Sequence, residues 1–234
     1  MKDQPAIPSL LFHSVRKEAG NDLFAIDPAR FEDIIASIAQ RFGAVTFPNL
    51  DDGKVLLTFD DGYRDNYELV VPILDKYHIK GLFFILPQYM GKQNMWNTRA
   101  DVLLDHMTKQ EVQALVAAGH TVGSHGLTHH KLTKFDDHQI QVELRESRRL
   151  LEDALEVHID CFAYPYGSTN ERVSHLAGQV YRYAFGTDTA PAHWNGSACT
   201  NIRREFVWPH SSPDDIEQLV VHFGTYDNNP YKQQ

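Results

Sequence analysis

Cysteine and concentrated positive charge are both scarce in this chain. Its 234 residues include 2 cysteines, Cys161 and Cys199, and carry 22 Lys and Arg against 31 Asp and Glu, a formal net charge of −9. Two thiols do not make a disulfide framework, so the cysteine content is compatible with a reducing compartment. Nothing in the sequence requires Cys161 and Cys199 to pair. Because nucleic-acid binding needs a concentrated basic surface, we expect no nucleic-acid partner.

Long apolar runs and low-complexity linkers are also missing. No segment approaches the length needed to span a bilayer, and the start, residues 1–8, has one Lys but no apolar stretch typical of a signal peptide. We therefore expect no membrane span and a cytoplasmic location. No repeat or Pro/Gly/Ser-rich linker divides the chain, and its length and 42% hydrophobic content predict a single domain over residues 1–234.

Short apolar runs alternate with amphipathic stretches, which is typical of βα units around a parallel sheet. The expected strands are residues 7–13, 54–59, 81–86, 121–124, 162–164 and 183–186. The expected helices begin at Asp27, after Gly62, at a capping box of Thr108 and Glu111, and at Asp136. This order favours a barrel of alternating strands and helices, with a doubly wound open sheet as the alternative.

Two adjacent carboxylates follow the second expected strand. Asp60 and Asp61 lie in the segment Thr-Phe-Asp-Asp-Gly at residues 58–62. The carboxyl end of a strand is where α/β folds place their active sites, and neighbouring anions repel unless a positive charge lies beside them. The alternative is a polar turn in which one Asp caps the following helix.

A histidine pair and a proline-containing turn follow later in the chain. His125 and His129 are four residues apart, so on a helical turn both imidazoles would face one metal ion, at Zn–N distances of about 2.0–2.1 Å. A solvated loop is the alternative in a chain with 13 histidines. Residues 162–167, Phe-Ala-Tyr-Pro-Tyr-Gly, predict a rigid turn whose N–H groups could face a reacting oxygen.

Taken together and in this order, the three segments resemble the motifs of the polysaccharide deacetylase family, the NodB-homology domain of carbohydrate esterase family four. That family's pattern is a TFDDG segment, then H-S/T-x-x-H, then R-x-P-Y/F, and the form at residues 162–167 resembles a recognised branch of it. The resemblance runs from about Ile7 to Arg204. It implies an α/β fold, a distorted (β/α) barrel with fewer than eight repeats.

The resemblance also implies roles for five residues. Asp60 matches the catalytic base, Asp61 with His125 and His129 matches the metal ligands, and Tyr166 matches the residue whose backbone N–H binds the oxyanion. One carboxylate and two neutral imidazoles leave coordination positions open for water and substrate. Zn²⁺ is the expected metal, and Co²⁺ or Ni²⁺ is also compatible with such a site.

The chain departs from the family pattern in three places. Gly126 replaces a Ser or Thr whose hydroxyl would brace the histidine loop, and Ala163 replaces the Arg that is the usual partner of the base. Residues 201–205 contain no Leu-x-His, so the general acid is unassigned. His13, at the end of the first strand, and Trp96, in the loop after the third, are candidates for the pocket wall. A core histidine and a buried loop anchor are the alternatives.

Charged residues on the helix that begins near Asp136 form a separate group. Arg145, Arg148 and Arg149 alternate there with Glu143 and Glu146. This alternation is typical of a solvated, ion-paired face rather than of a binding patch.

The leading hypothesis is metal-dependent hydrolysis of an N-acetyl group from an amino sugar in a glycan, a glycolipid precursor or a sugar nucleotide. One alternative is a C–N amidohydrolase acting on a small non-sugar amide or imide. Another is a catalytically silent glycan- or metal-binding module. Asp60 argues against the silent module, because such a module needs no base beside the ligand Asp61.

Overall fold

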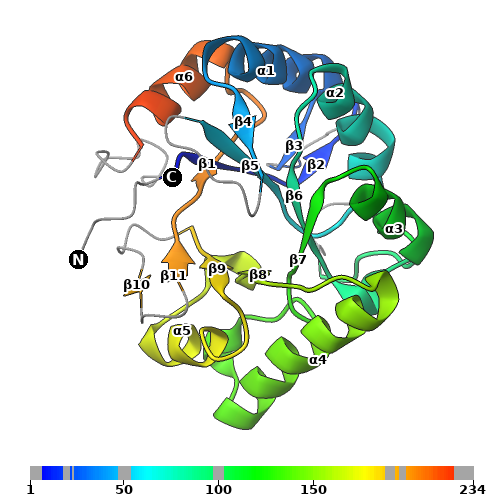
Figure 1. Ribbon diagram of the computed structural model, residues 1–234, viewed down its shortest axis with the longest axis vertical. Coiled ribbons are helices and arrows are strands. Elements are labelled where there is room, and N and C mark those ends of the chain that lie inside the picture. Colours follow the sequence, from blue (N-terminus) through cyan, green and yellow to red (C-terminus); the bar gives the residue numbers. More distant parts are fainter. Residues whose placement is uncertain are drawn as a thin grey trace.

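The computed structural model describes residues 7–17, 22, 24–46, 54–96, 103–187, 193–194 and 199–223. A curled sheet lies at the centre and helices cover its outer side (Figure 1). The strands are β1 (Ser9–Phe12), β2 (Ser14–Val15), β3 (Ala25–Ile26), β4 (Ala44–Val45), β5 (Val55–Phe59), β6 (Leu82–Ile85), β7 (Thr121–Ser124), β8 (Cys161–Ala163), β9 (Tyr183–Phe185), β10 (His193–Trp194), β11 (Cys199–Ile202) and β12 (Glu205–Phe206). The α-helices are α1 (Pro28–Arg41), α2 (Val71–Lys76), α3 (Lys109–Ala117), α4 (Asp137–Leu155), α5 (Glu171–Ala177) and α6 (Pro213–Val221).

The main sheet has the strand order β10-β11-β9-β8-β7-β6-β5-β1-β12, with β4 paired to β5. Its neighbours are parallel except for the antiparallel pair of β10 and β11. This curled parallel sheet, with helices on its outer side, confirms the distorted (β/α) barrel. Among the described residues, no helix has both the length and the apolar character needed to cross a membrane.

The central strands are apolar because both of their faces are covered. All five residues of β5 are buried, as are all four of β1 and of β6. Parallel strands with both faces covered read as continuous apolar runs rather than as alternating ones. The outer layer follows the helical period, since Phe31, Ile34, Ile35 and Ile38 form the buried side of α1. Each such side chain contributes about 1.5–3 kcal/mol on burial.

Local caps set the helix ends that the sequence predicted. The Asp27 side chain accepts hydrogen bonds from the first turn of α1. Thr108 and Glu111 form the expected capping box of α3, and Asp136 forms another at the start of α4. With the helices fixed on the outside, the carboxyl ends of the parallel strands meet at one edge of the barrel.

Candidate active site

The candidate site begins where β5 ends, in a backbone turn through two left-handed residues. Asp61 has φ 71° and Gly62 has φ 70°. A Cβ on Gly62 would lie 2.9 Å from the Ile85 side chain, so the turn requires glycine for space as well as for conformation. Asp60 still continues the sheet, because its N–H donates to the Phe12 carbonyl at 3.0 Å. Asp60 therefore still belongs to the sheet, whereas Asp61 belongs to the turn that follows it.

Asp61, His125 and His129 converge at this edge of the barrel. All three side chains are buried, and one ligand atom from each lies within 4.8 Å of the others. Asp61 Oδ1 is 3.4 Å from His125 Nε2 and 3.1 Å from His129 Nε2. Asp61 Oδ1 makes no conventional hydrogen bond in the described structure. A carboxylate oxygen facing two ring nitrogens in this way suits a divalent cation between them.

The electrostatics of the three groups are compatible with a cation site, since burial lowers the pKa of His129 and keeps that ring neutral despite the Asp61 charge. Burial would raise the pKa of Asp61, but the neighbouring histidines outweigh it and hold that pKa well below its usual range. Burial would lower the pKa of His125, and the charges of Asp60 and Asp61 raise it instead. The site therefore favours positive charge at its centre.

The second ring nitrogen of His125 has a fixed partner. His125 Nδ1 lies 2.9 Å from the Ala163 carbonyl, which can only accept. The proton is therefore on Nδ1, and the lone pair of Nε2 faces Asp61. Ala163 stands where the family pattern has Arg, and here its backbone orients a candidate ligand.

The histidine loop is not a helical turn, so the predicted geometry of the pair is wrong even though the two rings meet. The loop bends through Gly126 at φ 82° and His129 at φ 56°. The ring centroids of His125 and His129 are 5.1 Å apart. Two left-handed residues turn the chain back on itself, and this brings the imidazoles together without helical periodicity.

Glu143, on α4, braces this loop. Its Oε2 accepts hydrogen bonds from the N–H groups of Leu127 at 2.7 Å and Thr128 at 3.2 Å, and its Oε1 accepts from the Thr128 hydroxyl. Glu143 is 5% exposed, so the prediction that it lies on a solvated face is wrong. A Cβ on Gly126 would lie 3.2 Å from Glu143 Oε2. A buried carboxylate thus replaces the hydroxyl brace that the sequence lacks at Gly126.

Arg204 supplies the cation that Ala163 cannot. Its Nη1 lies 2.6 Å from Asp60 Oδ1 and its Nη2 lies 2.9 Å from Oδ2. The Arg204 side chain is fully buried, and its guanidinium lies over the rings of Phe84 and Phe185. Burial alone would raise the pKa of Asp60, but the charges of Arg204 and His125 hold it below its usual value. The usual partner is absent at Ala163, as the sequence indicates, and Arg204 takes its place.

Sequence reasoning did not single out Arg204, and its neighbour shows why. Arg203 pairs with Glu205 at 2.5 Å near the surface, whereas Arg204 points into the barrel. Consecutive residues of an extended segment face opposite sides, so one of the two was bound to point inward. Nothing in the local sequence says which one.

His13 directly follows β1, the strand that pairs with β5. Its carbonyl accepts a hydrogen bond from Asn66 Nδ2 at 2.7 Å, which anchors this end of the strand. Burial lowers the pKa of His13, and the charges of Asp61 and Asp60 oppose that effect. His13 is therefore close enough for both carboxylate charges to act on it, and its place in the pocket wall stays a prediction.

Aromatic rings enclose His129. Trp96 and Tyr166 lie over the His129 ring at centroid distances of 4.2 Å and 4.5 Å. Tyr166 is 53% exposed and has φ 58°, so its turn is left-handed. Trp96 is half-buried and also packs edge-on against Tyr89. Trp96 is therefore a direct neighbour of the candidate ligand His129, and its role in the pocket wall stays a prediction.

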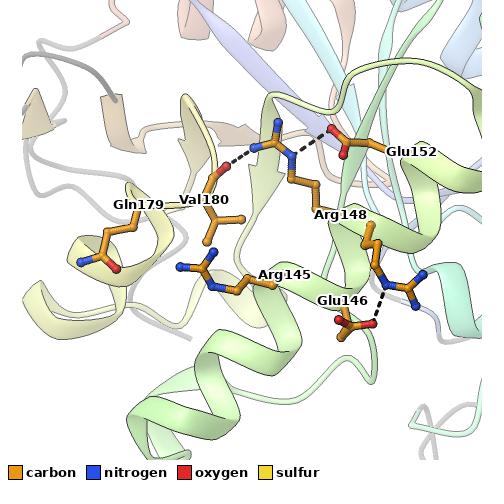
Figure 2. Close-up of a pocket in the computed structure, with 7 residues that line it drawn as sticks. Arg145, Glu146, Arg148, Glu152, Gln179 and Val180 are labelled. Atoms are coloured by element: carbon orange, nitrogen blue, oxygen red, sulfur yellow. Dashed lines mark hydrogen bonds and ion pairs between the residues drawn. The ribbon is translucent and has the colours of Figure 1, made fainter.

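The charged face of α4 lies apart from this site. Arg145, Arg148 and Arg149 line a cavity of about 410 Å³ between α4 and residues 179–180 (Figure 2). Arg148 pairs with Glu152 at 2.9 Å and donates to the Val180 carbonyl, and Arg149 pairs with Glu146 at 2.9 Å. Apart from Glu143, the predicted ion-paired surface is confirmed.

Cys161 and Cys199 are free thiols on separate strands. Both are in register with Tyr183 of β9, one from each side. Two strand spacings of about 4.8 Å separate them, which is beyond the reach of a disulfide.

Comparisons with known proteins agree with this fold and identify the family. The polysaccharide deacetylase family model matches residues 48–184. The Bacillus subtilis (strain 168) protein YxkH, which is named as a polysaccharide deacetylase, is 29% identical to this chain over 201 residues. The aligned residues cover 81% of this chain and 67% of that protein. The poly-beta-1,6-N-acetyl-D-glucosamine N-deacetylase of Staphylococcus aureus (strain MRSA252) is 31% identical over 127 residues, 50% of this chain and 42% of that enzyme.

A solved structure shares the whole architecture. The Streptococcus pyogenes deacetylase PplD, determined in complex with acetate, superposes with a TM-score of 0.76 at 21% identity over 93% of this chain and 99% of that one. This likeness shows a common fold. The chain belongs to the polysaccharide deacetylase family, on the strength of a family match over more than half of its length.

Proposed function

We propose that the protein is a metal-dependent N-deacetylase that hydrolyses the acetamide of an amino sugar within a glycan. The observation that carries the proposal is the convergence of Asp61, His125 and His129 beside a second carboxylate, Asp60, that is held by Arg204. One carboxylate is thus available to a cation, and the other is kept ionised and free of it. That division of roles is what base-assisted hydrolysis at a metal requires.

Asp61 Oδ1 and the Nε2 atoms of His125 and His129 would hold the metal, and Zn²⁺ suits this donor set, with Co²⁺ or Ni²⁺ as alternatives. When bound, the metal polarises the acetyl carbonyl and lowers the pKa of a water ligand. The Ala163 carbonyl keeps His125 in the tautomer that leaves Nε2 free. Burial and the Asp61 charge raise the pKa of Tyr63 well above its usual value, so this neighbour of Asp61 keeps its proton.

Asp60 takes a proton from the attacking water. Arg204 keeps its carboxylate ionised near neutral pH and fixes its orientation through two parallel hydrogen bonds. The backbone N–H of Tyr166 donates to the developing oxyanion. His13, whose ring burial keeps neutral, relays the proton from Asp60 to the leaving amine. These four roles are proposals that rest on the geometry described above and on the family motifs.

The name of the staphylococcal relative supports N-acetylglucosamine polymers as the first substrates to test. Acetate release would be measured from N-acetylglucosamine oligomers and from UDP-N-acetylglucosamine, before and after chelation and again after zinc is restored. We expect release that disappears on chelation, returns with zinc and falls by at least about 100-fold in Asp60→Asn. The metal content of His129→Ala, measured by mass spectrometry, tests the ligand set without relying on activity.

Two results would contradict the proposal. Hydrolysis of cyclic imides or ureides by a preparation inactive on all N-acetylated sugars would indicate an amidohydrolase of small amides. Tight glycan binding that is unchanged in Asp60→Asn, with no turnover by either protein, would indicate a binding module.

A further inference from the structure

The segment that carries the two carboxylates continues into an unusual helical turn. Asn66–Val70 form a π-helix, in which the Val71 N–H donates to the Asn66 carbonyl, and α2 follows with Pro72 in its first turn. Proline has no N–H, so a regular α-helical hydrogen bond cannot form at that position. π-Helical turns are rare and occur frequently at functional sites. The side chains at the start of this turn are therefore candidates for a role in the reaction.

Asp65 and Asn66, at the start of this turn, both reach the chain directly after β1. The Asn66 side chain is fully buried, and its Nδ2 donates to the His13 carbonyl at 2.7 Å and to Asp65 Oδ1 at 2.7 Å. A carbonyl and a carboxylate can only accept, so the direction of the Asn66 amide is fixed. The Ser14 hydroxyl donates to Asp65 Oδ2. The two side chains, here called the Asp65–Asn66 anchor, therefore hold two consecutive residues, His13 and Ser14.

The Asp65 carboxylate is the centre of this anchor. Burial raises the pKa of Asp65 to about 6, and the hydrogen bonds from Ser14 and Asn66 oppose that rise. The carboxyl group is therefore ionised at neutral pH, with one donor on each oxygen. Hydrogen bonds to an ionised acceptor are stronger than those between neutral groups. The anchor is thus strongest in the pH range where both oxygens accept.

His13 depends on the anchor because its ring makes no hydrogen bond to a described residue. Ring contacts alone surround it: the ring is parallel to Phe206 at a centroid distance of 5.9 Å and an angle of 2°, and it lies 4.8 Å from the Phe24 ring. Such contacts leave a ring free to slide, whereas a hydrogen bond fixes a distance and an angle. The bonds to the backbone and to Ser14 therefore supply much of the precision with which His13 is placed.

The anchor and the base belong to the same short segment, residues 60–66. The Asp60 N–H donates to the Phe12 carbonyl at 3.0 Å, and the anchor bonds His13 and Ser14. The segment therefore grips the chain on both sides of the His13 ring. Proton transfer needs its two groups within hydrogen-bond reach, and a misplacement of about 1 Å can cost about 100-fold in rate. One segment thus fixes both members of the proposed proton relay.

Building on the proposed function, we propose that Asp65 is a positioning residue, which holds His13 at the distance from Asp60 that the proton relay requires. It acts through Asn66 and the Ser14 hydroxyl rather than on the substrate. Loss of the Asp65 carboxylate should therefore impair the step that His13 serves and leave the metal site as it is.

The kinetic test is Asp65→Asn, which keeps the size of the side chain but presents an NH₂ group where one oxygen now accepts. We expect kcat for an N-acetylated sugar to fall about 10–100-fold and kcat for 4-nitrophenyl acetate, whose leaving group needs no proton, to stay within about threefold. The zinc content should equal that of the wild type. Asp75→Asn, which neutralises a 48% exposed carboxylate on α2, is the matched control and should follow the wild type. Equal losses on the two substrates overturn the proposal.

A double variant shows whether Asp65 acts through His13. His13→Asn/Asp65→Asn should then be as active as His13→Asn, because the group that Asp65 positions is already gone. Losses that multiply in the double variant overturn the proposal. Ser14→Ala removes one of the two donors and should give a smaller loss with the same preference for the activated ester.

Proton NMR of the zinc-free protein tests the anchor without relying on turnover. The His13 ring signal is assigned by its absence in His13→Asn, and the neighbouring Phe206 and Phe24 rings shift it. We expect this signal to move in Asp65→Asn and in Ser14→Ala, and to stay in place in Asp75→Asn. A signal that moves in this way supports the anchoring of His13 even if no acetate is released, a result that would count against the proposed function instead. An unchanged signal in Asp65→Asn overturns the anchor.

Discussion

Arg204 and Asp60 are 144 residues apart in the sequence and form a bidentate ion pair, and the arginine side chain has no exposed surface. Arg204 Nη1 also lies 3.3 Å from the Thr58 hydroxyl, and its Nε donates to the Gly186 carbonyl at 3.3 Å. The guanidinium therefore links the ends of β5 and β9. A cation with this many fixed partners sets both the charge state and the direction of the Asp60 carboxylate.

Replacing Arg204 with Met should therefore remove the base as well as a structural contact. We expect kcat/KM to fall at least about 100-fold and its acidic limb to move to higher pH, because the pKa of Asp60 rises once the cation is lost. The free energy of unfolding should fall by about 3–5 kcal/mol, since an unpaired carboxylate is left buried. Urea denaturation and pH–rate profiles measure the two effects.

The double variant Arg204→Met/Asp60→Asn is the control for that experiment. Removing both charges should recover part of the lost stability without recovering activity, because a neutral amide costs less to bury than an unpaired carboxylate. An unchanged pH profile in Arg204→Met would argue against control of Asp60 by Arg204.

Glu143→Leu should loosen the metal site without touching a ligand. Leu has no acceptor for the hydrogen bonds that Leu127 and Thr128 now donate, so the loop carrying His129 loses its brace. Zinc affinity, measured by competition with a chromophoric chelator, should fall about 10–100-fold.

Glu146→Leu on the same helix is the matched control, because Glu146 is 44% exposed and pairs with Arg149 at the surface. Its zinc affinity should equal that of the wild type. Equal affinities in both variants would mean that the loop keeps its shape without Glu143.

His13→Asn should impair amide hydrolysis more than hydrolysis of an activated ester. An amine leaving group must be protonated as it departs, whereas a nitrophenolate leaves without help. We expect kcat for an N-acetylated sugar to fall about 10²–10³-fold and kcat for 4-nitrophenyl acetate to fall far less. Equal losses on the two substrates would assign His13 to the shape of the pocket rather than to proton transfer.

His120, which lies away from the candidate active site, should lower the stability of the protein in mild acid because its ring becomes protonated on unfolding. Burial lowers the pKa of His120 to about 4, and its Nδ1 accepts a hydrogen bond from the Gly81 N–H at 3.2 Å. The unfolded chain binds a proton near pH 6.5, so stability falls as pH drops from about 6.5 toward 4. The contribution at pH 5 is about 2 kcal/mol, on an order-of-magnitude basis.

His120→Asn should remove this pH dependence, because the amide oxygen can replace Nδ1 as an acceptor and does not titrate. Urea denaturation of both proteins at pH 7.5 and pH 5 measures the difference. If both lose the same stability between the two values, other groups cause the loss.

Much of the site and fold follows from the sequence by itself. Buried parallel strands require continuous apolar runs, and β1, β5 and β6 show them. Caps such as Thr108 with Glu111 act through contacts three residues apart, so local sequence is enough to predict them. The segments carrying Asp60, Asp61, His125, His129 and Tyr166 were likewise recognisable, because each follows a strand and the family order is kept.

Only the tertiary structure decided what surrounds those residues. Arg204 and Glu143 reach the site through strand order, helix packing and side-chain direction, none of which local sequence specifies. The chain has Ala163 where the family pattern has an Arg, and Gly126 where it has a residue with a hydroxyl. Distant residues on other elements supply the cation beside the base and the brace of the histidine loop instead. A buried carboxylate requires a cation and a ligand loop requires a brace, but the physics does not prescribe which part of the chain provides them.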